Sequence, residues 1–200
     1  MNTLIIYAHT GEVKYLRDKL GSHKPTLGGI TLASFRDKSK KASLDKLLDN
    51  ADLIINAGIA GRLSDSLSLG ESYLIENLTN EKRSTLFDLT GERFFKIAKE
   101  TINSDGSHSA TLVTCGQPIT DTDSRISLTE TSGADLVDME ALPIYNKAVK
   151  SKTPFLCIKL VSDNADEEAE TTVKKRTEIL SKKLGSDMLK LLVGLNDYNL

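Results

Sequence analysis

Short apolar runs alternate with amphipathic stretches along most of this chain, and this alternation limits its fold more than any other feature. A buried strand is typically an apolar run of about four to eight residues, whereas a surface helix repeats apolar residues every three or four positions. Six apolar runs predict strands, at residues 3–8, 28–34, 53–57, 72–75, 110–114 and 154–161. Five stretches predict helices, at residues 12–20, 44–48, 94–102, 141–149 and, as a long amphipathic helix covering the sheet, 171–192. The pattern therefore predicts an α/β fold with helices flanking a central sheet.

Length and charge narrow the class of protein. A chain of 200 residues can bury one sizeable core, so we expect one domain over residues 1–200. The net charge is −2 and both signs are mixed along the chain, which argues against a nucleic-acid-coating protein. The first strand lacks the basic flank of a signal peptide, and no apolar stretch approaches the roughly 18 residues of a membrane helix. We therefore expect a soluble, cytoplasmic protein that binds neither nucleic acid nor a membrane.

The two cysteines are expected in the core. Cys115 and Cys157 both lie within apolar runs. Reduced core thiols are the preferred interpretation, ahead of a disulfide or a nucleophile.

Polar clusters stand at the ends of three predicted strands. They are Ala8-His-Thr-Gly-Glu12, Asn56-Ala-Gly-Ile-Ala-Gly61 and Val161-Ser-Asp-Asn-Ala-Asp166. In open α/β sheets, ligands bind at the carboxyl ends of strands. We expect the second cluster to be a turn, whose glycines let backbone amides approach a ligand closely. A fourth cluster, Val137-Asp-Met-Glu-Ala141, precedes a predicted helix.

Each cluster taken alone has a plainer structural interpretation. Asp163 is the kind of residue that caps a helix. Glu12 suits the first turn of a helix, where a carboxylate interacts favourably with the helix dipole. Glu140 is likewise a reasonable helix-start residue, and the glycines could form an ordinary turn.

The order of the clusters is more informative than any one of them. A Glu after the first strand, then Gly-Ile-Ala-Gly, Asp-Met-Glu-Ala and Ser-Asp-Asn-Ala-Asp, resembles the nucleoside phosphorylase and nucleosidase superfamily. Within it, the opening Ile5-Ile-Tyr-Ala-His-Thr-Gly-Glu-Val13 and the segments 16–20, 53–61 and 67–71 are most similar to 5′-methylthioadenosine/S-adenosylhomocysteine nucleosidases. The resemblance covers roughly two-thirds of the chain. It implies a mixed central sheet and cleavage of the N-glycosidic bond of a purine nucleoside.

The resemblance also implies roles for individual residues. Asp163 matches the acid that protonates N7 of the leaving base, and Glu12 matches the carboxylate that activates water. A positioned proton donor lowers the barrier because a purine anion is a poor leaving group. Glu140 matches the residue that binds the ribose hydroxyls, Met139 matches one that packs on the sugar, and Ile119 stands where the backbone reads the adenine edge.

Further substrate-binding candidates lie in the same motifs. Ala60, Gly61 and Ser162 are expected beside the substrate. His9, three residues before Glu12, is a candidate pocket residue, although a loop histidine is the plainer interpretation.

The chain also departs from the family it resembles. Its N-terminal half is shorter, and the missing part falls between Gly29 and Leu53, where the family has an extra strand pair. Ile59 replaces a Ser, Pro118 stands where nucleosidases have an aromatic that stacks on the base, and Glu71 replaces an Asp. These differences concern the substrate more than the fold.

Hydrolysis is the preferred reaction, but three alternatives stay open. A phosphorylase needs a cationic cradle for phosphate, for which Arg17, Arg36 and Arg62 are candidates. The carboxylate of Glu12 would repel phosphate and suits water activation. The Gly58-Ile-Ala-Gly61 motif is also similar to futalosine hydrolases, which usually carry Asn where Asp163 stands. The third alternative is a non-catalytic nucleoside-binding relative.

No cofactor or metal is expected. His9, His23 and His108 are far apart and lack metal-ligand spacing. A dinucleotide site is not indicated, because no G-x-G-x-x-G motif follows the first strand. The family resemblance implies a small-molecule nucleoside as the partner and a homo-oligomer, most simply a dimer.

Overall fold

The computed structural model describes residues 1–22, 29–37, 39, 41–82, 85–90, 93–102 and 109–197. Its strands are β1 (Thr3–Tyr7), β2 (Ile30–Ser34), β3 (Leu53–Arg62), β4 (Ser72–Asn80), β5 (Leu86–Asp88), β6 (Ser109–Thr114), β7 (Leu136–Asp138) and β8 (Phe155–Asp163). Its helices are α1 (Lys14–Ser22), α2 (Lys41–Asp49), α3 (Arg93–Ile102), α4 (Thr122–Ser132), α5 (Ala141–Ser151) and α6 (Ala169–Asp197). Gly28, His23 and His108 lie outside the described residues.

The eight strands form one mixed sheet that closes on itself. Strand β3 pairs in parallel with β8, which pairs antiparallel with β4. Strands β4, β6 and β7 continue in parallel, and β7 returns to pair antiparallel with the end of β3. Strands β1 and β2 extend the sheet outward from β3, and β5 extends it from β4. Strand β3 therefore has neighbours on both sides along most of its length.

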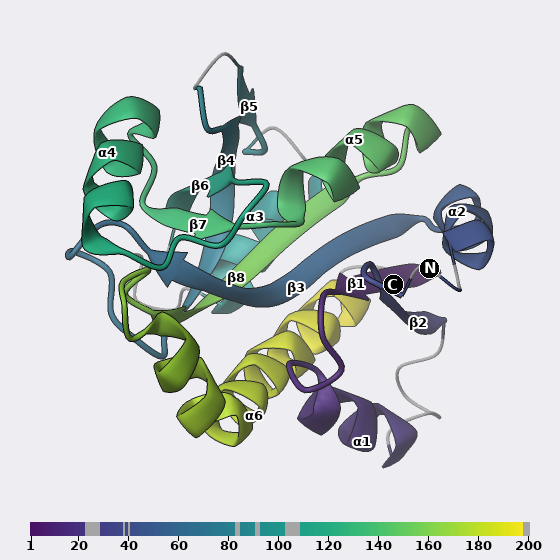
Figure 1. The fold of residues 1–200 in the computed structure, drawn as a ribbon. Coiled ribbons are helices and arrows are strands. Elements are labelled where there is room, and N and C mark those ends of the chain that lie inside the picture. The colour runs from purple at the N-terminus through teal and green to yellow at the C-terminus, as the bar shows by residue number, and fades with distance from the viewer. Residues whose placement is uncertain are drawn as a thin grey trace.

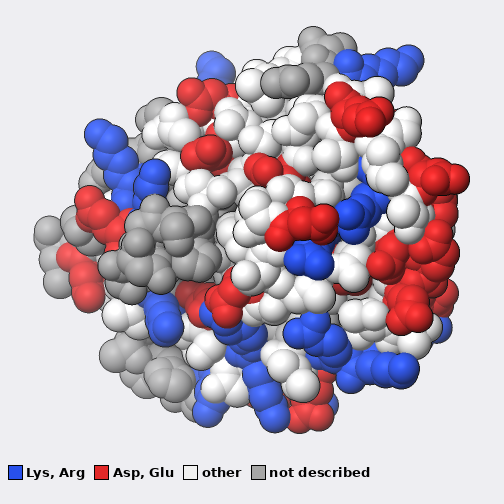
Figure 2. Space-filling view, turned by 90° about the vertical axis from the view of Figure 1, so that its left-hand side faces the viewer, with Lys and Arg blue, Asp and Glu red and all other residues white. Residues whose placement is uncertain are grey.

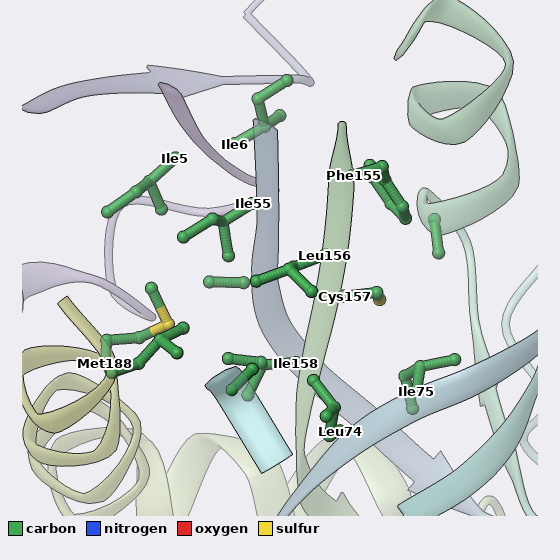
Figure 3. Packing of buried hydrophobic residues seen from close by; sticks show 14 of the residues in the cluster. Ile5, Ile6, Ile55, Leu74, Ile75, Phe155, Leu156, Cys157, Ile158 and Met188 are labelled. Carbon is green, nitrogen blue, oxygen red and sulfur yellow. The ribbon is translucent and has the colours of Figure 1, made fainter. Parts of the chain in front are cut away.

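Helices cover the sheet on both sides. In Figure 1, α1 and α6 lie below the sheet, and α4 and α5 lie above it. Helix α6 packs against α1, α3 and β8, as the long amphipathic pattern predicted. Successive side chains of a strand point to opposite faces, so β8 buries both of its faces. Figure 3 shows Met188 of α6 on the same side as Ile5 and Ile55, with Phe155 and Cys157 directed to the other side.

The predicted α/β fold is confirmed, with three elements that the patterns missed. Helix α4 and the short strands β5 and β7 had no clear signal of apolar periodicity. One prediction was wrong: residues 58–61 do not form a turn, because β3 continues to Arg62. Neither Gly58 nor Gly61 has a positive φ, so these glycines serve another purpose, described below.

Further sequence expectations concern the cysteines, the surface and the membrane. Cys115 and Cys157 are free and buried, and burial raises the pKa of both thiols to about 12, so both are unreactive at neutral pH. Figure 2 shows acidic and basic side chains together on one face of the molecule. In the described part of the chain, no helix combines the length and the apolar character needed to cross a bilayer.

Candidate active site

The glycines of β3 bring two predicted catalytic carboxylates close to the backbone. A Cβ atom on Gly58 would lie 3.3 Å from Glu12 Oε2 and 3.5 Å from Lys159 Nζ. A Cβ atom on Gly61 would lie 3.1 Å from Asp163 Oδ1 and 3.0 Å from Ala165 Cβ. The two positions are three residues apart, roughly 10 Å along a strand. The glycines therefore leave room beside β3 for the side chains of Glu12 and Asp163.

Glu12 lies in the segment between β1 and α1, next to Gly58. Its side chain is buried, and Oε2 accepts one long hydrogen bond of 3.4 Å from the His9 backbone N–H. Burial raises the pKa of Glu12 to about 7, and the nearby Lys159 ammonium only partly offsets this effect. A carboxyl group with a pKa near neutrality is well matched to exchange a proton with water.

Lys159 lies beside Gly58, close to Glu12. It follows Phe155 and Cys157 at alternate positions of β8, and its side chain is 2% exposed. Its Nζ lies 2.8 Å from Asp138 Oδ2 at the end of β7. Burial alone would lower the pKa of Lys159, but the interactions with Asp138, Cys157 and Glu140 together more than offset burial, so the pKa is raised and the ammonium stays charged.

Hydrogen bonds to Asp138 hold this ion pair in place. Oδ1 accepts from the Thr114 hydroxyl at 2.7 Å, and Oδ2 accepts from the Ala141 backbone N–H at 2.9 Å. Thr114 Oγ1 in turn accepts from the Leu142 N–H at 3.1 Å. The start of α5, the ends of β6 and β7 and the middle of β8 are thereby tied to one buried charge pair.

Asp163 is the last residue of β8 and lies next to Gly61. The pairing of β3 with β8 shifts between Ala60 and Gly61, so Gly58 pairs with Lys159 while Gly61 pairs with Asp163. Such a bulge inserts one extra residue and redirects side chains. Oδ1 of Asp163 accepts from the Ala165 N–H at 2.8 Å, and Oδ2 contacts the Ser162 hydroxyl. Helix α6 starts only at Ala169, so Asp163 is not its cap.

Ser162 contacts Asp163 and the backbone of β3. Its hydroxyl also lies 3.2 Å from the Ala60 carbonyl oxygen, and its side chain is buried. Ser162 and Ala60 thus lie beside Asp163, with the Ser162 hydroxyl directed toward the protein.

Glu140 and Met139 lie between β7 and α5. Glu140 precedes α5 without capping it by its side chain, and it is buried. Its Oε1 accepts hydrogen bonds from Nε and Nη2 of Arg36, with the Nε distance at 2.8 Å. Arg36 Nη2 also lies 3.4 Å from Met139 Sδ. The two predicted sugar-binding residues are therefore joined through one arginine.

A cavity of about 600 Å³ opens beside this arginine at the ends of β1 and β2. Its polar lining includes Tyr7, His9, Thr10, Arg17, Ser34 and Arg36. The structure thus places His9 in the wall of a cavity, while its backbone contacts Glu12.

Ile119 belongs to a second apolar cluster, separate from the main core. It packs against the buried members of this cluster, which are Leu63, Val113, Cys115, Leu128, Ala134, Val137 and Ala165. Because Ala165 and Val137 also approach Gly61, this cluster adjoins Asp163. The surroundings of Asp163 on this side are therefore apolar.

Sequence reasoning missed the roles of Lys159, Asp138, Thr114 and Arg36. A lysine inside an apolar strand was a usable signal, since a buried lysine requires a carboxylate partner. The partner of Arg36 is 104 residues away in the chain, and no local pattern could have found it. Among the described residues, no group of three His, Cys, Asp or Glu side chains is placed to hold a metal ion.

The mixed central sheet with helices on both sides defines an α/β protein. The sequence pattern of the phosphorylase superfamily matches residues 42–193, and the chain belongs to that superfamily. The match begins at residue 42, so Glu12 and Arg36 lie before it.

Solved structures with the same fold include nucleoside-cleaving enzymes. The chain is similar to futalosine hydrolase of Helicobacter pylori, with 17% identity, a TM-score of 0.80 and coverage of 96% of this chain and 97% of that one. It is also similar to the 5′-methylthioadenosine/S-adenosylhomocysteine nucleosidase of S. pneumoniae, with 19% identity, a TM-score of 0.79 and coverage of 98% and 100%. The corresponding nucleosidase of Neisseria meningitidis has 18% identity, a TM-score of 0.78 and coverage of 98% of this chain and 100% of that one. At these identities the likeness shows the fold.

Proposed function

We propose that this protein is an N-glycosidase that hydrolyses a purine nucleoside. One observation carries the proposal: Glu12 and Asp163 are both buried, and they lie against two glycines of the same strand, Gly58 and Gly61 of β3. An oxocarbenium-like sugar is stabilised by nearby carboxylates, and the departing base needs an acid on its far side. The fold shared with nucleosidases and a futalosine hydrolase supports the same reaction class.

The two carboxyl groups divide the work of hydrolysis. Glu12 takes a proton from water, whose oxygen forms the new bond to C1′ of the sugar. The bond from C1′ to N9 breaks, its electron pair moves into the base, and Asp163 donates a proton to N7. Glu140 and Met139 hold the sugar, while Ile119 and its apolar neighbours adjoin the base.

Ser162 supports the role of Asp163 as an acid. One hydroxyl carries one hydrogen, and it lies within reach of both the Ala60 carbonyl and Asp163 Oδ2. When that hydrogen serves Ala60, a protonated Asp163 can donate to the same hydroxyl. When it serves Asp163, the ionised carboxylate is stabilised. The contact therefore accommodates both protonation states that the reaction requires.

Phosphorolysis is the second candidate reaction, because Arg17 and Arg36 line one cavity. The three arginines do not form one cradle, however. Arg62 donates to Asn164 Oδ1 at 2.8 Å and to the Leu67 carbonyl at 2.9 Å, and Arg36 is bonded to Glu140. The buried carboxylate of Glu12 would repel phosphate, so hydrolysis is favoured.

Base release with and without phosphate tests the proposal. The substrates are 5′-methylthioadenosine, adenosine and inosine, and free base is measured by chromatography. We expect release at the same rate in phosphate-free buffer and in buffer containing phosphate. Release only with phosphate would make the protein a phosphorylase. Binding of nucleosides, seen as thermal stabilisation without release, would make it a non-catalytic relative.

A futalosine-type substrate and a homodimer are the remaining parts of the proposal. The name of the Helicobacter pylori relative supports adding futalosine to the substrate panel. Exposed apolar side chains, among them Ile126, Val149, Ile179 and Val193, are available to an interface. Sedimentation of the purified protein tests the dimer directly.

A further inference from the structure

Arg36 reaches the predicted sugar site from the edge strand of the sheet. Strand β2 pairs in parallel with β1, with Ser34 opposite Tyr7, and the Phe35 N–H donates to the Tyr7 carbonyl at 2.8 Å. This pairing carries Arg36 to the same end of the sheet as His9. The Arg36 side chain is 40% exposed and lines the cavity of about 600 Å³, whereas its partner Glu140 is 9% exposed.

Both contacts from Arg36 are made to one oxygen of Glu140. Nε and Nη2 each donate to Oε1. No hydrogen bond links Oε2 to any residue in the part of the chain that the structure describes. A carboxylate oxygen accepts about two hydrogen bonds, so the two oxygens of Glu140 are used unequally.

The same arginine also limits how Glu140 and its neighbour can move. Arg36 Nη2 approaches Met139 Sδ at 3.4 Å, so a single planar group contacts both side chains that the proposal assigns to the sugar. A guanidinium presents its donors in a fixed plane, and it therefore sets the direction of a bound carboxylate more strictly than an ammonium does.

We propose that Arg36 is a positioning residue for sugar recognition. By holding Oε1 of Glu140, it directs Oε2 to accept a hydrogen bond from the 2′-hydroxyl of the substrate. Discrimination between a ribonucleoside and its 2′-deoxy analogue then depends on Arg36. This inference rests on the proposed function and adds the sugar to it.

A substrate pair that differs by one hydroxyl tests the inference. Base release is measured for adenosine and 2′-deoxyadenosine, or for the best ribonucleoside and its 2′-deoxy analogue, with wild type, Arg36→Met and Arg36→Lys. We expect Arg36→Met to lower kcat/KM for the ribonucleoside by about 10- to 100-fold, as for loss of a charged hydrogen bond. The 2′-deoxy substrate should lose much less, so the ratio of the two falls toward one.

Two variants separate positioning from a general loss of structure. Arg36→Lys keeps the positive charge and the fold, and should still reduce the ribose preference, because it lacks the planar fork. Arg176→Lys, on α6 and outside the cavity, should leave the ratio unchanged. A merely structural role for Arg36 would reduce activity on both substrates equally.

The outcomes distinguish this inference from the proposed function. Wild type that releases base with a ribose preference unaltered in both Arg36 variants would overturn the inference and keep the function. If wild type releases no base, thermal stabilisation by the same two ligands replaces the rate as readout. Stabilisation by adenosine that is lost in Arg36→Met supports the inference as a binding role, and no stabilisation by either ligand overturns both.

Discussion

Glu12 and Asp163 are both buried carboxyl groups beside glycines of β3, yet their surroundings differ. Glu12 receives one long backbone hydrogen bond of 3.4 Å, and burial raises its pKa to about 7. Asp163 receives a backbone hydrogen bond of 2.8 Å and contacts a hydroxyl that serves either protonation state. The difference is consistent with the proposed mechanism, in which Glu12 gains a proton and Asp163 gives one.

Replacing the proposed acid, Asp163, should have the largest effect, and this effect is on the rate of base release. Asp163→Asn cannot donate a proton to N7, so we expect kcat for base release to fall by about 10²- to 10⁴-fold. Rates are measured by chromatography, and circular dichroism checks that the fold is kept. Asp123→Asn, an exposed residue of α4, serves as the matched control with unchanged rate. An Asp163→Asn enzyme with wild-type kcat would remove the distinction between the two ends.

Removing the ammonium group of Lys159 should have the second largest effect, and this effect is on stability. Lys159→Met leaves Asp138 buried without its ammonium partner, which we expect to reduce the free energy of unfolding by about 3–5 kcal/mol. Urea denaturation measures the change. Lys182→Met breaks an exposed ion pair with Glu178 and should leave stability unchanged. Equal effects of the two substitutions would argue against a structural role for the buried pair.

The pH dependence of stability probes Glu12 alone. Its pKa is 4.5 when unperturbed and about 7 in the folded protein, so its contribution to stability is fully present below pH 4.5 and is lost as the pH rises through 7. Glu12→Gln does not titrate. Relative to wild type it should therefore gain stability between pH 5 and pH 8, by at most about 3 kcal/mol. Urea denaturation at both pH values measures this gain. Glu168→Gln, at an exposed position, should show none, and a pH-independent difference for Glu12→Gln would be evidence against the raised pKa.

The glycines should give the smallest effects. A Cβ at Gly61 would meet Ala165 Cβ at 3.0 Å and Asp163 Oδ1 at 3.1 Å, so we expect Gly61→Ala to cost about 1–3 kcal/mol of stability. Gly21→Ala is the control: among the described residues beyond its own helical turn, no atom lies within 4 Å of the added Cβ, and alanine in a helix should be slightly stabilising. Thermal unfolding of both variants measures the difference. Similar melting temperatures would mean that Gly61 is not needed for close approach.

The sequence predicted the fold well where the elements carry a strong hydrophobic pattern. The strands near residues 3–8 and 154–161 and the long C-terminal helix are confirmed within a few residues. Helix α4 was missed because it is rich in Ser and Thr and lacks an apolar stripe. Its ends were readable, since Asp121 caps it and Gly133 ends it with φ 61°. The length of β3 was misjudged because glycines usually mark turns, whereas here they admit neighbouring side chains.

The site could be predicted only in part, because its contacts join residues far apart in the chain. The motif order indicated Glu12, Glu140 and Asp163, and the structure buries all three. Asp138 and Thr114 were not foreseen, because the hydrogen bond between them follows from the pairing of β6 with β7. The catalytic roles of Glu12 and Asp163 and the sugar-binding role of Glu140 stay predictions.

The dependence of base release on pH tests the central claim most directly. Wild type is assayed in phosphate-free buffer from pH 5 to pH 9, beside Glu12→Gln. With a pKa of about 7 for Glu12, the wild-type profile of kcat/KM against pH should bend near pH 7, while Glu12→Gln is slow and lacks this bend. A wild-type profile without the bend, matched in rate by Glu12→Gln, would contradict the assignment of Glu12 as the base.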